Sequence, residues 1–294
     1  MSEIHYDMPL FRPPSEGNNL IIQATLGCSF NKCTFCSMYK SKNYTARPLK
    51  AVFADIDEAA RNWPEASRVF LADGDALALP TDHLLEILGY LASALPELTR
   101  VSSYALPKNL MQKSVEELES LKARRLSLIY YGIETGSADI QRRIRKGATP
   151  DFMADGLARA QKAGIKSSCT VILGLGGKNR WRDHIEATAE LVNRVAPTYL
   201  STLQLMLDEA GRQDFLEHFG EPFVFQDDAG ILIELEELVA HLNPERPVIF
   251  RSNHASNALP LAGTLPKDKE RLLEAIARAK TDALQLRPAA YRAL

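Results

Sequence analysis

The sequence predicts an α/β protein, a partial (β/α)6 barrel with a C-terminal α-rich extension. Its 294 residues are enough for one large core, and α/β barrels commonly form single domains of this size. Short apolar segments alternate with segments of helical periodicity, which is typical of βαβ units and a parallel sheet. Three of the four cysteines lie in one loop directly after the first apolar segment. That loop follows the carboxyl end of a strand, where such folds place their functional residues.

Six strand–helix units account for the first two thirds of the chain. Thr149 can cap a helix that starts at Asp151, Pro150 suits the first position of that helix, and Gly164 suits its end. The strands are expected at 20–26, 68–72, 100–103, 126–133, 166–173 and 199–206. The other clear helices are expected at 51–62, 81–95, 114–124 and 181–195.

The pattern loosens after Leu207. We expect a polar, partly helical stretch, a helix, a short strand and a long helix opened by Thr264, which packs on the barrel flank. No linker-like segment separates this region from the barrel. The chain is therefore predicted to be a single domain, with an N-terminal arm (1–19), the partial barrel (20–207) and an extension (208–294) that closes or flanks the barrel.

Composition limits the partners and the compartment. The chain is 46% hydrophobic and 24% charged, with a net charge of −2 and no basic block, which disfavours nucleic acid. A local basic groove is compatible with this total, so a small RNA substrate stays open. No apolar run is long enough for a membrane span, and the arm lacks the order of a signal peptide. Crowded cysteines without a disulfide framework favour a reducing cytoplasm.

Cys28, Cys33 and Cys36 form a C-x4-C-x2-C motif. Three thiolates can hold three irons of a four-iron cluster and leave the fourth iron open to a ligand. A structural zinc site needs a fourth ligand, which here would have to come from far along the chain, and a plain electron-transfer cluster also needs a fourth cysteine. Cys169 lies inside an apolar strand and is expected to be a core residue. The spacing favours the cluster with an open iron, and zinc is the alternative.

The cysteine segment resembles the cluster loop of the radical S-adenosylmethionine (SAM) superfamily, in which three cysteines follow the first strand of a partial barrel. The usual spacing is C-x3-C-x2-C, so this loop has one extra residue, while Gly27 and the aromatic Phe35 both fit. The resemblance implies an oxygen-sensitive [4Fe-4S] cluster on Cys28, Cys33 and Cys36, with SAM bound to the open iron.

Further segments extend the resemblance through about residue 205. Asp73-Gly74-Asp75 stands where the family has a Gly-Gly-Glu-like motif that holds the SAM ammonium, although an ordinary acidic turn would read the same way. A carboxylate beside a glycine suits an ammonium, because the backbone can approach closely while the carboxylate accepts charged hydrogen bonds. Ser103, with Ser102 before it, is a candidate ribose or methionine contact.

The ends of the fourth and fifth strands carry the remaining SAM candidates. The segment around Glu134 resembles methylthiotransferases and porphyrin-modifying relatives, in which this side chain faces SAM. A basic residue about a dozen positions on pairs with the SAM carboxylate, which points to Lys146, with Arg145 adjacent. Ile172 and Gly174 end the fifth strand, where the family binds adenine; a glycine there is also an ordinary turn signal.

The resemblance implies reductive cleavage of SAM and hydrogen abstraction from a substrate, with an electron donor such as flavodoxin or ferredoxin. His254, with Arg251 and Asn253, is the candidate substrate-contacting group, and a small polar molecule is the expected substrate. The alternatives are a non-catalytic metal- or SAM-binding barrel protein and an RNA-modifying radical SAM enzyme.

Overall fold

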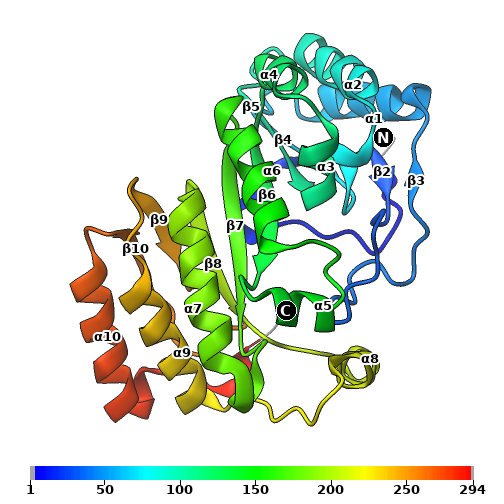
Figure 1. Ribbon diagram of the computed structural model, residues 1–294. Helices are drawn as coiled ribbons and strands as arrows, with labels where there is room; N and C mark the ends of the chain where they lie inside the picture. Colours follow the sequence, from blue (N-terminus) through cyan, green and yellow to red (C-terminus); the bar gives the residue numbers. More distant parts are fainter. Residues whose placement is uncertain (1–3, 293–294) are drawn as a thin grey trace. The chain divides into compact units, whose positions relative to one another are not determined.

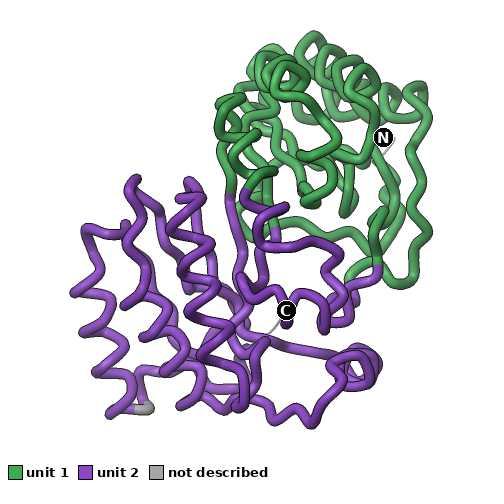
Figure 2. Tube along the Cα trace, viewed as in Figure 1, with its two compact units in different colours: residues 1–31, 38–131, 155–167 green, residues 32–37, 132–154, 168–294 purple. Residues whose placement is uncertain are grey.

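The computed structural model describes residues 4–292, which form two compact units (Figure 2). The first unit contains residues 4–31, 38–131 and 155–167, and the second contains 32–37, 132–154 and 168–292. The cysteine loop contributes to both, because Cys28 belongs to the first unit and Cys33 and Cys36 belong to the second. The predicted single-domain organisation stays a prediction.

The first unit is built on parallel strands in the order β1-β4-β5-β6. The strands are β1 (Leu20–Gln23), β4 (Arg68–Ala72), β5 (Arg100–Ala105) and the first part of β6 (Leu126–Glu134). A small antiparallel pair, β2 (Thr25–Leu26) and β3 (Thr45–Ala46), flanks the cysteine loop. The helices and 3-10 turns are η1 (Pro14–Glu16), α1 (Leu49–Asn62), η2 (Ala76–Ala78), α2 (Thr81–Ala94), α3 (Pro107–Gln112), α4 (Val115–Ala123) and most of α6 (Pro150–Lys162) (Figure 1).

One core of the first unit joins the strands to the N-terminal arm. Ile21, Phe70 and Ala72 are buried, and Tyr104 and Tyr130 pack edge-on against Phe70. The arm adds Tyr6 and Leu10 to this cluster. Apolar contacts of Tyr6 and Leu10 therefore join the arm to this core.

The second unit continues the strand–helix alternation in the order β7-β8-β9-β10. Strands β7 to β9 are parallel and β10 is antiparallel to β9. The strands are β7 (Lys166–Leu173), β8 (Tyr199–Gln204), β9 (Val248–Arg251) and β10 (Ala262–Leu265). The helices and 3-10 turns are α5 (Ala138–Arg143), α7 (Gly177–Val195), α8 (Glu209–Phe219), α9 (Asp228–His241), α10 (Lys269–Thr281), η3 (Ala283–Gln285) and η4 (Ala289–Tyr291). Helix α9 packs between α7 and α10 (Figure 1).

The six predicted strand–helix units are confirmed, and so is the capping of α6. Thr149 Oγ1 accepts a hydrogen bond from Phe152 N, and Gly164 ends the helix with a left-handed φ of 73°. The expected strand at 20–26 is interrupted, because Ala24 separates β1 from β2.

The prediction that Thr264 opens the last helix is wrong. Residues Ala262–Leu265 form β10, paired antiparallel with β9, and the helix begins only at Lys269. A residue before proline is disfavoured in helical conformation, so Pro266 keeps Leu265 extended and delays the helix. Within residues 4–292, no helix combines the length and apolar character that a membrane span requires.

Candidate active site

The first unit places Cys28 at the start of the cysteine loop, directly after β2. Gly27 precedes it with φ 70°, and a side chain at Gly27 would lie 3.1 Å from the carbonyl oxygen of Asn43. Cys28 is half-buried. Burial, with Asp75 and Cys28 nearby, raises the pKa of Tyr44 to about 12. Tyr44, which was not identified from sequence, therefore lies close to both Cys28 and the acidic turn.

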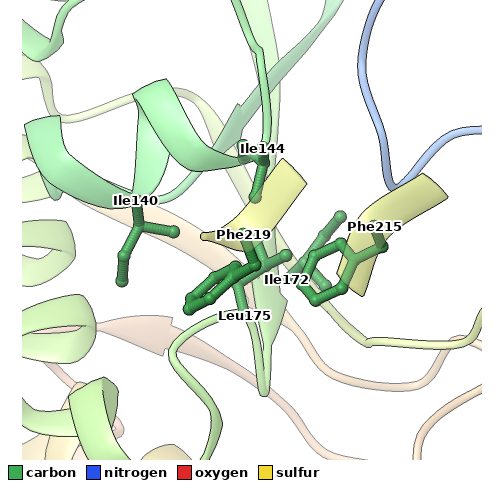
Figure 3. Packing of buried hydrophobic residues seen from close by; sticks show 6 residues of the cluster. All are labelled: Ile140, Ile144, Ile172, Leu175, Phe215 and Phe219. Carbon is green, nitrogen blue, oxygen red and sulfur yellow. The ribbon is translucent and has the colours of Figure 1, made fainter. Parts of the chain in front are cut away.

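The second unit holds Cys33 and Cys36, both half-buried, on a short segment anchored by its neighbours. Thr34 N donates a 3.1 Å hydrogen bond to Ile144 O at the end of α5. Phe35 packs against a buried apolar cluster that draws on α5, β7 and α8. Figure 3 shows the six buried members of that cluster: Ile140, Ile144, Ile172, Leu175, Phe215 and Phe219.

Glu134 and Lys146 form a buried ion pair beside this segment. Lys146 Nζ lies 2.6 Å from Glu134 Oε1 and 5.7 Å from the centre of the Phe35 ring. Burial opposes the charge on Lys146, but the carboxylate of Glu134 and the thiols of Cys33 and Cys36 outweigh it and raise the pKa of this lysine. Three residues predicted from sequence, Phe35, Glu134 and Lys146, are thus brought together with Cys33 and Cys36 within one unit.

Two backbone features support this ion pair. Glu134 has a left-handed φ of 62°, a conformation that costs a non-glycine residue about 1–3 kcal/mol and that clusters at active sites and ligand clamps. Gly132 leaves the room that the pair fills, since a Cβ there would lie 1.9 Å from Glu134 Oε1 and 2.7 Å from Lys146 Nζ. Arg145, by contrast, is exposed and contacts His218 of α8.

The acidic turn after β4 is fully buried. Ser29 Oγ donates to Asp75 Oδ2, while Asp75 Oδ1 makes no hydrogen bond of normal geometry with a described residue. Burial raises the pKa of Asp75, although Ser29 and Lys108 act against this shift. Asn109 Nδ2 is also buried, and Asn109 interacts with the Asp75 carboxylate and likewise acts to lower its pKa. This end of the unit therefore offers a buried carboxylate oxygen of Asp75 to a ligand.

Ser102 and Ser103 are buried and bonded to the backbone. Ser103 Oγ donates to Leu71 O and to Tyr104 O, each at 3.1 Å, and Ser102 Oγ donates to Val69 O at 3.4 Å. Their predicted contacts with SAM stay predictions.

A buried carboxylate that sequence reasoning missed lies at the end of β7. Gly174, with φ 89°, donates from its backbone N–H to Glu234 Oε2 at 2.6 Å, and Gln226 Nε2 donates to Glu234 Oε1 at 2.9 Å. Burial raises the pKa of Glu234 to about 7, although these two hydrogen bonds act to lower it. Glu234 lies on α9, 60 residues after Gly174. Only the fold brings the two together.

His184 is a second buried polar residue that was not predicted. Its Nδ1 lies 2.8 Å from Thr135 Oγ1 and its Nε2 lies 2.9 Å from Ile172 O. The carbonyl can only accept, so Nε2 carries the proton and Nδ1 accepts from Thr135. Burial lowers the pKa of His184 to about 4, against the hydrogen bond to Ile172. His184 thus fixes the ends of β6 and β7, next to Glu134 and Gly174.

The block after β9 is held together by its own hydrogen bonds. His254 Nδ1 accepts from Ser256 N at 3.1 Å, and burial, with Arg287, lowers the pKa of His254. Arg287 donates to the carbonyl oxygens of His254 and Asn257. Arg251 and Asn253 are exposed. The predicted role of His254, Arg251 and Asn253 in contacting a substrate stays a prediction.

Comparison with known proteins assigns the family. Residues 22–192, more than half of the chain, match the Radical SAM superfamily. The chain therefore belongs to the radical SAM superfamily, a class of enzymes that use a [4Fe-4S] cluster and SAM.

One curated relative is the Methanocaldococcus jannaschii protein named "Putative methylthiotransferase MJ0865". It is 24% identical over 185 residues, which cover 58% of this chain and 40% of that protein. The chain thus spans well under two thirds of the length of this relative.

Solved structures share the fold of this chain. Coproporphyrinogen III oxidase from Escherichia coli, a radical SAM enzyme, aligns with a TM-score of 0.57 and 15% identity over 76% of this chain and 51% of that chain. A radical SAM methyltransferase from Kitasatospora setae, with cobalamin and a [4Fe-4S] cluster bound, aligns with a TM-score of 0.53 and 16% identity. That alignment covers 63% of this chain and 36% of that chain. Methylornithine synthase aligns with a TM-score of 0.54 and 13% identity over 88% of this chain and 68% of that chain. The mostly parallel sheet with its helices is the predicted partial β/α barrel.

The residues present fit the two cofactors. Three half-buried thiols supply the ligand type of an iron–sulfur cluster. Asp75 Oδ1 is a buried acceptor suited to an ammonium, and Lys146 is a buried cation suited to a carboxylate. Within the described residues, no three Cys, His, Asp or Glu side chains are arranged to hold a metal ion. The joint ligation by Cys28, Cys33 and Cys36 therefore stays a proposal.

Proposed function

We propose that the protein cleaves SAM reductively and abstracts a hydrogen atom from a small polar substrate. The observation that carries this proposal is the buried Glu134–Lys146 pair beside the segment of Cys33 and Cys36. Taking a charged pair out of water is expensive, and charged groups in such surroundings are concentrated at functional sites. When bound, the cluster supplies the electron that splits SAM into methionine and a 5′-deoxyadenosyl radical.

Each part of the chain has a separate task in this proposal. Cys28, Cys33 and Cys36 hold the cluster, and Phe35 shields it from water by packing into the apolar cluster of the second unit. Asp75, within the turn of Asp73 and Gly74, receives the SAM ammonium.

The other SAM groups are assigned to the second unit and to β5. Lys146, with Arg145 adjacent, attracts the SAM carboxylate, and Ile172 and Gly174 border the adenine. Ser103 is assigned to the ribose or the methionine part.

The substrate and the electron donor are inferred from chemistry alone. Exposed Arg251 and Asn253, with half-buried His254 beside them, suit hydrogen bonds to a small polar molecule. A flavodoxin or ferredoxin is the proposed reductant, and a reducing cytoplasm the proposed compartment, because thiol ligands persist there.

A second candidate is methylthio transfer or the modification of RNA. The likeness to a protein named as a methylthiotransferase supports it. The net charge of −2 gives no electrostatic support for binding RNA.

The first experiment tests the cluster and its chemistry. Anaerobic reconstitution should give about four iron and four sulfide per chain and a brown protein. Adding SAM and dithionite should then produce 5′-deoxyadenosine, measured by mass spectrometry. Cys33→Ala should abolish both results, whereas Cys169→Ala, which alters the buried cysteine of β7, should preserve both. Zinc in a colourless protein, or SAM binding without turnover, would overturn the proposal in favour of a non-catalytic barrel.

The second experiment identifies the substrate class. Cells of the source organism are grown on deuterated medium and fractionated into small molecules and RNA. Deuterium transferred into 5′-deoxyadenosine reports which fraction supplied the hydrogen atom. Transfer from the small-molecule fraction supports the proposal, and transfer from RNA alone would replace it with the second candidate.

A further inference from the structure

The fully buried side chain of Asp73 joins both ends of the cysteine loop. Its Oδ2 accepts a 3.1 Å hydrogen bond from Gly27 N, the residue before Cys28. The same oxygen accepts a 2.9 Å hydrogen bond from Lys42 Nζ, on the far side of the loop. One carboxylate oxygen thus connects the residue that enters the loop to a residue that leaves it.

Lys42 is committed to this contact. Its side chain is 6% exposed, and besides Asp73 it contacts Asp7 Oδ1 at 2.8 Å and Asp7 O at 2.6 Å. These three acceptors match the three N–H groups of an ammonium. Lys42 therefore links the N-terminal arm, the cysteine loop and the end of β4.

The returning part of the loop also packs on the glycine of the turn. A Cβ at Gly74 would lie 2.5 Å from Cε2 of Tyr39, so the glycine is needed for the approach of this ring. Asn31, with a left-handed φ of 43°, lies in the longer first spacer. Its Nδ2 donates to Tyr39 O at 2.7 Å and to Lys42 O at 3.4 Å. The lengthened loop is therefore folded back onto the acidic turn by several contacts.

We propose that Asp73 is a positioning residue that clasps the cysteine loop through Gly27 and Lys42. This inference rests on the proposed cluster function and reassigns Asp73 from contacting SAM to holding the loop. It also accounts for an aspartate where the related motif has glycine. Lys42 neutralises the added charge of Asp73. The clasp acts before any cofactor is present, because it connects residues of the apoprotein alone.

The test compares the reactivity of the cysteines in the apoprotein. Alkylation by iodoacetamide is followed at each cysteine by peptide mass spectrometry, with buried Cys169 as the internal reference for global opening. Lys42→Met, which leaves the buried Asp73 charge uncompensated, should raise the alkylation rate of Cys28 by about tenfold or more. The double variant Asp73→Asn/Lys42→Met removes both charges, so its Cys28 alkylation rate should lie between those of Lys42→Met and the wild type. Asp55→Asn, which removes the ion pair with Arg47 in the same unit, should leave the rate unchanged.

Reconstitution supplies an independent readout. Iron and sulfide content should fall in Lys42→Met, recover partly in the double variant and stay unchanged in Asp55→Asn. Equal alkylation rates and equal iron content in all four proteins would overturn the clasp. If Cys169 becomes reactive in Lys42→Met, that variant has unfolded globally and the double variant is used in its place. A Cys28 alkylation rate equal to that of the wild type in the double variant would then overturn the proposal. If the wild type binds no iron while the alkylation pattern holds, the cluster function fails and the clasp stands.

Discussion

The Lys146 ammonium donates a 2.6 Å hydrogen bond to Glu134 Oε1, and less than a tenth of either side chain is exposed. Glu134 ends β6 and Lys146 follows α5, so the pair joins the two residues on either side of this short helix. Phe35 of the cysteine segment lies against the lysine. The ion pair is therefore placed to tie the predicted SAM-facing residues to the predicted cluster segment within one unit.

Breaking this pair should destabilise the protein strongly. Lys146→Met leaves Glu134 buried and uncompensated, which typically costs about 3–5 kcal/mol. Replacing both partners, in Glu134→Gln/Lys146→Met, should restore much of the free energy of unfolding while still impairing SAM binding. Urea unfolding and isothermal titration with SAM measure the two effects separately. Lys178→Met, in a half-exposed pair with Asp227, should change neither by comparison. Additive losses in the double variant would contradict the coupling.

Gly132 offers a second test of the ion pair, because a side chain there would occupy the space that the pair fills. Gly132→Ala adds one methyl group 1.9 Å from Glu134 Oε1, so the pair must move. We expect a loss of about 1–3 kcal/mol in unfolding free energy and weaker SAM binding. Gly89→Ala is the matched control, because Gly89 lies inside α2 and its added methyl would meet only the flexible end of Arg124. That change should be neutral or stabilise by about 0.4–1 kcal/mol. Equal effects of the two substitutions would contradict the prediction.

The strand–helix framework could be predicted because its signals are local. The strand at 166–173 ends in the apolar residues Val171 to Leu173 and lies between the turn residues Gly164 and Gly174, and it is found with the same bounds. The caps of α6 were likewise recognisable, since Thr149, Pro150 and Gly164 act on neighbouring backbone. By contrast, β10 escaped prediction because it depends on pairing with β9, which the hydrophobic pattern alone does not reveal.

The site residues likewise fall into those with a local sequence signal and those that depend on long-range contacts. The spacing of the cysteines is visible in the sequence, and so is the interval between Glu134 and Lys146. The contacts of Asp73 with Lys42, and of Glu234 with Gly174, join residues 31 and 60 positions apart. Such pairs have no local signature, because each member reads as an ordinary polar residue of a loop or helix. Long-range pairing therefore determines which acidic residues are free for a ligand.

Glu234 should make the protein less stable as the pH rises. Its pKa of about 7 in the fold lies above the ordinary 4.5, so the folded state binds more protons between these values. The stabilisation is full below pH 4.5 and is lost as the pH rises through 7, by at most about 3 kcal/mol.

The test is the unfolding free energy of the wild type minus that of Glu234→Gln, measured between pH 4.5 and 8. This difference should fall with rising pH. Glu236→Gln, which alters a more exposed carboxylate of the same helix, should give a difference with a smaller slope. A flat wild-type difference would show that Glu234 does not titrate in this range.

His184 should act in the opposite direction. Its pKa of about 4 in the fold lies below the ordinary 6.5, so the unfolded state binds more protons between these values. Its contribution is full above pH 6.5 and is lost as the pH falls through 4, by at most about 3 kcal/mol. The physical reason is that a second proton on the ring would have to enter at Nδ1, which already accepts from Thr135. His184→Gln should be less stable at pH 7 yet lose less on acidification, as measured by urea unfolding at a series of pH values. Parallel pH profiles for the two proteins would contradict this role, and a steeper loss in the variant would contradict the neutral ring.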